Sequence, residues 1–96
     1  MMIIQTVKFK SGLSDAEMNR VMKERMPEFR ALPGLIQKYY AREEATGEVI
    51  GIYIWDSMDS VKEYRQSELA KTIPTAYEAQ GTPRIEIFEV MELLRE

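Results

Sequence analysis

The sequence contains no cysteine and no histidine among its 96 residues. Disulfide bonds, thiolate nucleophiles and zinc sites of the usual kinds are therefore excluded, because they depend on these side chains. Imidazole acid–base chemistry is excluded for the same reason, and no remaining side chain has an unperturbed pKa close to neutrality. Any base must be a carboxylate, lysine or tyrosine with a shifted pKa, or else water.

Long apolar segments are also lacking, and neither sign of charge dominates. No uninterrupted apolar run approaches the roughly 20 residues that cross a bilayer, and the N-terminal segment has no basic leader, so we expect a cytoplasmic protein without a membrane partner. The 13 basic and 16 acidic residues give a net charge of −3. Because basic and acidic residues are interleaved, no general attraction to nucleic acid or anionic lipid is expected.

The composition that remains is that of one folded domain over residues 1–96. Apolar residues make up 45% and charged residues 30% of the chain, which is ordinary for a globular protein. A chain of this length can bury a core, but roughly 35 to 40% of its unfolded surface would stay exposed in a monomer. No linker or low-complexity segment divides it.

The first part of the chain reads as a strand followed by a helix. Alternating residues predict a strand over Ile3–Phe9. Ser14 and Glu17 match a capping box, in which each side chain satisfies a free backbone N–H of the other residue. Apolar residues then recur three or four apart, as on one face of a helix. Pro27 predicts a kink within this helix, and residues 32–34 (Leu-Pro-Gly) end it.

A hairpin follows, with strands expected over Leu35–Glu43 and Val49–Trp55 and a turn at Gly47, which can adopt a positive φ. Asp56 or Ser57 can cap a second helix, whose inward face includes Tyr64.

The last third of the chain is expected to break at Ile73 and Pro74. A short helical turn over residues 75–79 and a loop over residues 80–83 come next. The alternating pattern then predicts a final strand over residues 84–94.

The resulting order, β-α-β-β-α-β, predicts a ferredoxin-like plait of the α+β class. Four antiparallel strands take the order 4-1-3-2, and both helices lie on one face. The third strand is apolar on both sides, so each side needs a cover, and the helices provide only one. A homodimer through the helix-free face is therefore expected, and that face carries Ile4, Ile50, Ile52 and Ile54.

Two segments carry a resemblance to a known family: PGLIQKYY at 33–40 and TGEVIGIYIWDSMDSVKEYRQSE at 46–68. With the loop and final strand that follow, they resemble the dimeric α+β barrel superfamily, in its antibiotic-biosynthesis-monooxygenase-like branch. The similarity spans nearly the whole chain and is greatest to the small mono-oxygenases typified by YdhR. It implies subunits whose sheets pair face to face and a ligand pocket between the sheet and the helices.

The resemblance also implies an activity without cofactor or metal. Related mono-oxygenases oxidise small phenolic or quinol-type compounds, and the substrate itself reduces dioxygen once it has lost a proton. The protein then has to provide a dry aromatic pocket, help to remove the proton and stabilise developing charge. Haem-degrading relatives hold iron with a histidine at a position that falls near Ile73, and this chain has none, so haem degradation is not expected.

Seven residues are candidates for such a pocket. Gln5, at a superfamily pocket position, is a hydrogen-bonding group that could equally make a structural hydrogen bond. Adjacent Tyr39 and Tyr40 point to opposite faces of their strand, and we place Tyr39 on the helix side. The catalytic candidates are Gln5, Trp55 and Tyr39, and the candidate pocket residues are Phe9, Tyr53, Tyr64 and Arg65. The aromatic residues could instead belong only to the core, and Arg65 to the surface.

Two other functions remain open at this point. The chain could be a non-catalytic homodimeric module that binds a small ligand or serves in assembly, and a fully packed interior would favour it. It could also be an isomerase or decarboxylase of the muconolactone type, which needs a carboxyl or basic group inside the cavity.

Overall fold

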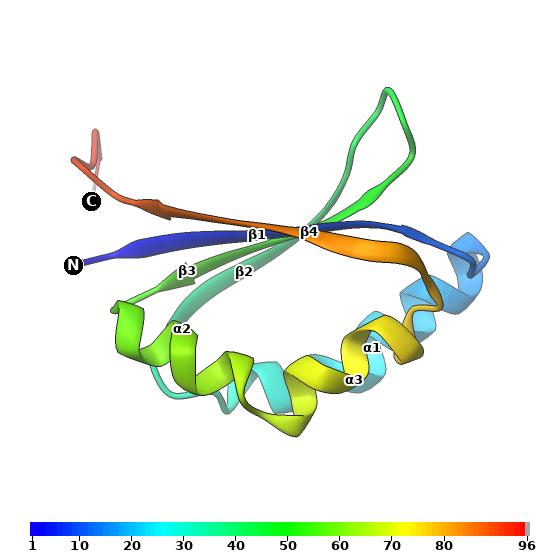
Figure 1. The fold of residues 1–96 in the computed structure, drawn as a ribbon, viewed down its shortest axis with the longest axis horizontal. Coiled ribbons are helices and arrows are strands. Elements are labelled where there is room, and N and C mark those ends of the chain that lie inside the picture. The colour runs from blue at the N-terminus through cyan, green and yellow to red at the C-terminus, as the bar shows by residue number, and fades with distance from the viewer. Residues whose placement is uncertain (96) are drawn as a thin grey trace.

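The computed structural model describes residues 1–95. It shows one antiparallel sheet covered on one face by helices, and its strand order β2-β3-β1-β4 is the predicted order (Figure 1). The ferredoxin-like α+β fold is therefore confirmed. Within these residues no helix is long and apolar enough to cross a membrane. The elements are β1 (Ile3–Ser11), α1 (Asp15–Arg30), β2 (Leu35–Arg42), β3 (Val49–Trp55), α2 (Met58–Arg65), α3 (Glu68–Ala76) and β4 (Ala79–Glu89).

Helix α1 begins at the predicted capping box. The Glu17 N–H donates to Ser14 Oγ at 3.2 Å, and the Ser14 N–H donates to Glu17 Oε1 at 3.0 Å. The helix buries Met18 and Phe29 against the sheet and continues through Pro27. The proline therefore does not end the helix, and the kink expected there stays a prediction.

The second helical region divides at a different place from the one expected. Ser57 caps α2, but the break before α3 lies at Ser67, whose Oγ accepts from the Ala70 N–H at 3.2 Å. The break and short helical turn predicted around Pro74 were wrong, because α3 continues through this residue. Burial of Leu69 and Ile73 against the sheet offsets the backbone hydrogen bond that a proline cannot donate.

Strand β4 also differs from its predicted bounds. The segment expected as a loop, residues 80–83, is part of the strand, because a register shift between Lys8 and Lys10 lets the end of β1 pair with Gln80 and Ala79. The strand ends at Glu89 rather than at Leu94.

The pairing register assigns each strand residue to a face. Tyr39 lies opposite Ile52 on the helix-free face and is 55% exposed, so its expected place on the helix side was wrong. The cause is a register shift between Leu35 and Gln37, which adds one residue to β2 and moves the following side chains to the other face. Tyr40, opposite Gly51, is the ring that faces the helices.

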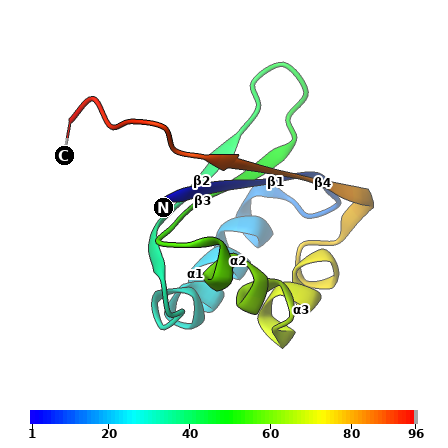
Figure 2. The ribbon, with the colours of Figure 1, turned by 60° about the vertical axis from the view of Figure 1, so that its left-hand side comes forward.

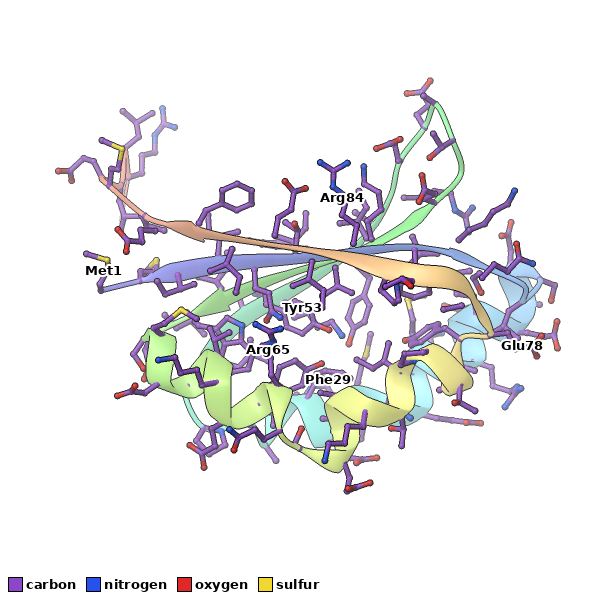
Figure 3. All side chains as sticks on the ribbon, viewed as in Figure 1. Met1, Phe29, Tyr53, Arg65, Glu78 and Arg84 are labelled. Carbon is purple, nitrogen blue, oxygen red and sulfur yellow. The ribbon has the colours of Figure 1, made fainter. Side chains whose placement is uncertain are left out.

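Helices α1, α2 and α3 lie on the same side of the sheet, and no helix of residues 1–95 covers the opposite side (Figure 2). Ile4, Ile50, Ile52 and Ile54 are only half-buried there. Phe88 on β4 is 47% exposed, and Arg84 also points away from the helices (Figure 3). The chain therefore presents an apolar sheet face, bordered by charge, to its surroundings.

Candidate functional site

A cluster of aromatic rings fills the space between the centre of the sheet and the helices. Tyr53 points from β3 towards α1, where Phe29 points back at it (Figure 3), and the two ring centroids are 6.2 Å apart. The ring centroid of Tyr64 on α2 lies 5.5 Å from that of Tyr53 and 5.2 Å from that of Trp55. Trp55 has no exposed surface at all. These rings form the centre of the core, and each hollow described below is lined by at least one of them.

Gln5 lies beside this cluster and is 1% exposed. Its side-chain oxygen accepts a hydrogen bond from the Trp55 indole N–H at 3.0 Å. An indole nitrogen can only donate, so the amide oxygen must face Trp55 and the amide NH₂ must point elsewhere. Within residues 1–95 this NH₂ has no hydrogen-bond partner. One end of the amide is thus held by the core, and the other is free to donate.

A hollow of about 240 Å³ lies between β1, β4 and the helical pair α2 and α3. We call it the Gln5 hollow. It brings together three of the predicted residues, Gln5, Tyr64 and Arg65, and Arg65 points from α2 towards the sheet (Figure 3). The remaining wall is mainly apolar, with a second cation at Lys71. Other residues that line it are Val7, Ala70, Ile73, Pro74, Pro83 and Ile85.

The other predicted residues border different spaces. Phe9 and Tyr53 line a void of about 20 Å³, which is separated from the Gln5 hollow by Val7 and Ile73, since these two line both. Trp55 lines a third space of about 140 Å³ together with Tyr64. Tyr39 lies on the other face of the sheet. The structure therefore collects only part of the predicted site into one hollow.

The buried tyrosines are donors rather than bases. The Tyr53 and Tyr64 hydroxyls lie 3.2 Å apart. Burial raises the pKa of Tyr64 to about 12 and places the pKa of Tyr53 well above its ordinary value. Both phenols are therefore neutral at physiological pH and can hydrogen-bond to a substrate oxygen or to each other.

Lys38 is the residue that the sequence analysis missed. Its Nζ lies 3.4 Å from the centroid of the Phe29 ring and 4.6 Å from that of Tyr53, on the helix side of the sheet. Burial, with a smaller contribution from the positive charge of Arg25, lowers the pKa of Lys38 to about 7. The aromatic faces offset part of the desolvation cost. The available signal was the spacing in β2, which puts Lys38 and Tyr40 on the same face.

Acidic residues do not gather into a metal site in this structure. Within residues 1–95, no three His, Cys, Asp or Glu side chains lie close enough together to hold a metal ion. The polar groups that line the Gln5 hollow are an amide, a phenol, a guanidinium group and an ammonium group.

Comparison with known proteins gives a family match and several similar folds. The family described as "Putative mono-oxygenase ydhR" matches residues 3–95. No curated protein matches the chain. Solved structures with the same fold include SnoaB, "a cofactor-independent oxygenase from Streptomyces nogalater", at 18% identity and a TM-score of 0.77, covering 99% of this chain and 98% of that one.

Two further structures are similar to the same degree. A "putative antibiotic biosynthesis monooxygenase" from Caulobacter crescentus CB15 is 22% identical, with a TM-score of 0.77, and the match covers 95% of this chain and 91% of that one. Rv0793 from Mycobacterium tuberculosis is 10% identical, with a TM-score of 0.77, and the match covers 99% of this chain and 100% of that one. At these identities the likeness shows a common fold.

Proposed function

Because the chain belongs to the family described as "Putative mono-oxygenase ydhR", we propose that it is a cofactor-independent mono-oxygenase of a small phenolic or quinol-type compound. The reaction takes place in the Gln5 hollow. The observation that carries the proposal is the amide of Gln5, which the Trp55 indole holds at its oxygen end while its NH₂ has no partner within residues 1–95.

The residues of the hollow suit a phenolate better than a neutral phenol. The Gln5 NH₂ donates to the substrate oxygen, and the positive charges of Arg65 and Lys71 favour its ionised form. The apolar wall, including Val7 and Ile73, keeps bulk water away and so strengthens these interactions. Tyr64 stays protonated and can donate to the same oxygen.

The reaction balances without a cofactor for a phenol with a free C–H para to its hydroxyl group. Dioxygen takes all its electrons from the substrate, one oxygen atom becomes the new quinone oxygen, and the other leaves as water with the two hydrogens that the substrate loses. Naphthol, for example, gives naphthoquinone and water. The protein contributes binding, orientation and stabilisation of charge.

Oxygen uptake by metal-free protein tests this proposal directly. A panel of naphthols, quinols and dihydroxyaromatic compounds is expected to contain at least one substrate that the wild-type protein turns over. Gln5→Ala and Trp55→Phe should lower kcat/KM by about tenfold or more, because one removes the donor and the other releases it from its fixed position. Lys23→Ala, at an exposed site on α1, is the matched control. Wild-type turnover no higher than that of the Gln5 and Trp55 variants would contradict the proposal.

We also propose that the protein works as a homodimer joined through the helix-free face. The exposure of Tyr39 and Phe88 beside the half-buried isoleucines of β1 and β3 supports this. At about 25 cal/mol per Å², each 400 Å² of apolar surface that the pairing buries contributes on the order of 10 kcal/mol before the cost of association. Pairing in this way leaves the helix side of each sheet, and with it the Gln5 hollow, free for substrate.

A second candidate is a non-catalytic module that binds a small ligand. The observation that favours it is the full burial of the Gln5–Trp55 pair, which a purely structural hydrogen bond also explains. The two functions differ in one measurement, because a binding module would bind naphthol in the Gln5 hollow without consuming oxygen.

A further inference from the structure

A second and larger hollow lies on the other side of the aromatic cluster, between α1 and β2, which is an edge strand of the sheet. We call it the Lys38 groove. Its volume of about 370 Å³ falls within the range of about 300–1,000 Å³ that is typical of small-molecule pockets. It shares no lining residue with the Gln5 hollow. The residues that shape it include Met26, Phe29, Arg30, Ile36, Lys38 and Tyr40.

The charged side chains in the described lining of this groove are two cations, Lys38 and Arg30, and its other polar groups are the Gln37 amide and the Tyr40 phenol. Lys38 Nζ rests on three aromatic rings, of Phe29, Tyr40 and Tyr53, and in the described part of the chain it makes no ion pair and donates no hydrogen bond. Arg30 shares the same wall, and within residues 1–95 its side chain donates one weak hydrogen bond, of 3.9 Å, to Met26 Sδ and makes no ion pair.

No acidic side chain belongs to the described lining of the groove. A half-buried ammonium group is unfavourable when nothing neutralises it, and the guanidinium group of Arg30 adds a second positive charge to the same wall. An anion placed between Lys38 and Arg30 would remove this cost. Apart from Gln37, the remaining wall is aromatic and aliphatic, so it suits a ligand with an apolar body.

We propose that the Lys38 groove binds a small aromatic carboxylate, with the carboxylate held between Lys38 and Arg30 and the ring packed against Phe29, Met26 and Ile36. The guanidinium group of Arg30 can bind both carboxylate oxygens at once. Lys38 provides the opposing point charge from the floor of the groove. This site is separate from the proposed oxygenation site, so the proposed binding does not depend on that function.

Binding at this site should be linked to a proton. The charged and titratable groups close to the Lys38 amine are Arg25 on α1, Tyr40 on β2 and Tyr53 on β3, while Arg30 lines the same groove and acts on Tyr40. Burial raises the pKa of both tyrosines and lowers the pKa of Lys38 to about 7, so Lys38 titrates near neutrality while the tyrosines stay neutral. A carboxylate favours the ammonium form. Above pH 7, binding must therefore take up a proton, and affinity must fall as pH rises.

Isothermal titration calorimetry with three probes tests the site. Naphthoate carries both charge and ring, naphthylmethanol carries only the ring, and acetate carries only the charge. Naphthoate is expected to bind at least about tenfold more tightly than either of the others. In buffers of different ionisation enthalpy, its binding should take up close to one proton per protein at about pH 8 and almost none at about pH 6.

Variants identify the groups responsible. Lys38→Met keeps the side-chain length without the charge, and it should weaken naphthoate binding at least about tenfold and abolish proton uptake. Arg30→Gln, at an exposed position where folding is not at risk, should weaken binding severalfold and leave proton uptake in place. Arg20→Gln, an exposed change on the same helix, is the matched control and should change neither.

The proposal is overturned if naphthoate gives no binding heat, or if it binds no more tightly than naphthylmethanol. It is equally overturned if wild-type binding takes up no proton at about pH 8, or if Lys38→Met binds as the wild type does. Should Lys38→Met fail to fold, proton uptake by the wild type and the Arg30→Gln affinity decide the question on their own.

Discussion

At the scale of single residues, the hydrogen bond between Gln5 and Trp55 joins two strands inside the core. Its two partners are 1% and 0% exposed, so neither can exchange this bond for one with water. The same bond fixes which end of the amide faces the Gln5 hollow. The stability of the fold and the proposed chemistry therefore involve the same contact, and the two effects can be measured separately.

Gln5→Leu should lower the free energy of unfolding by about 1–3 kcal/mol, because it leaves the buried Trp55 N–H without an acceptor. The same substitution made in a Trp55→Phe background should cost less, since no donor is then stranded. Urea denaturation of the four proteins in this double-mutant cycle measures the coupling. An equal cost in both backgrounds would show that the hydrogen bond contributes nothing.

Lys38 predicts how stability varies with pH. Its pKa falls from 10.5 in the unfolded chain to about 7 in the folded protein, so between these values the unfolded state binds more protons. The contribution of Lys38 to the free energy of unfolding must therefore rise with pH above 7, by at most about 1.4 kcal/mol per pH unit. Urea denaturation at pH 7, 8 and 9 should show wild type gaining stability relative to Lys38→Met. If the free energies of unfolding of the two proteins changed with pH in parallel, the lowered pKa of Lys38 would be contradicted.

The sequence led to seven predicted pocket residues, with Gln5 placed by the family resemblance, and three of them, Gln5, Tyr64 and Arg65, line one hollow in the structure. It could not identify Lys38 or the orientation of Tyr39. Both lie in β2, where one additional residue near Ile36 reverses the alternation. A lysine on an apolar face also has no signal in composition, since its environment is created by the packing of three aromatic rings around it.

At the scale of elements, the turn at Gly34 joins α1 to β2 and fits closely against α2. Its φ is +80°, and a Cβ atom at this position would clash with Ser60 Oγ and lie 2.6 Å from Asp56 Oδ1. The Gly34 carbonyl also accepts the Asp56 N–H at 2.9 Å, which links the start of β2 to the end of β3. The turn therefore fixes the hairpin against the start of α2.

Gly34→Ala should lower the free energy of unfolding by about 2–4 kcal/mol, because both the backbone conformation and the contacts oppose a side chain. Gly47→Ala is the matched control, since its φ of +75° is similar but a Cβ atom there would meet nothing within 4 Å. It should cost only about 1 kcal/mol. Thermal unfolding of both variants measures the difference, and equal losses would mean that the close fit at Gly34 is unimportant.

Local signals explain which elements were predicted correctly. The capping box of α1 and the glycine turn of the hairpin are short-range features, and both were read correctly from the sequence. The break between α2 and α3 was misplaced because Pro74 is a strong local breaker, while the burial of Ile73 that holds α3 together is a tertiary effect. The extension of β4 over residues 79–83 likewise depends on its pairing with β1.

At the scale of the whole molecule, the bare sheet face predicts the oligomeric state. The wild-type protein should show a mass of about twice 11.2 kDa by light scattering at micromolar concentration. Ile52→Glu, at the centre of this face, should give a monomer, because a carboxylate would have to be buried in an apolar interface. Lys23→Glu on the helix side is the control. A wild-type mass near that of one chain would contradict the proposed pairing.

The overall fold could be predicted because strand order and helix placement follow from apolar periodicity and from the hand of two crossovers. The hollows could not be predicted, because their presence depends on how side chains such as Ile73 and Val7 divide the space beneath the sheet. From the sequence we expected a pocket between the sheet and the helices. Its division into separate hollows, and the presence of the Lys38 groove, are seen only in the structure.

The most direct test of the account is the fate of isotopically labelled dioxygen. Metal-free wild-type protein supplied with a turned-over naphthol under ¹⁸O₂ should give a quinone that contains one labelled oxygen atom, with the second label in water, and Gln5→Ala should form this product at least about tenfold more slowly. A quinone without label, or equal rates for the two proteins, would contradict oxygenation in the Gln5 hollow.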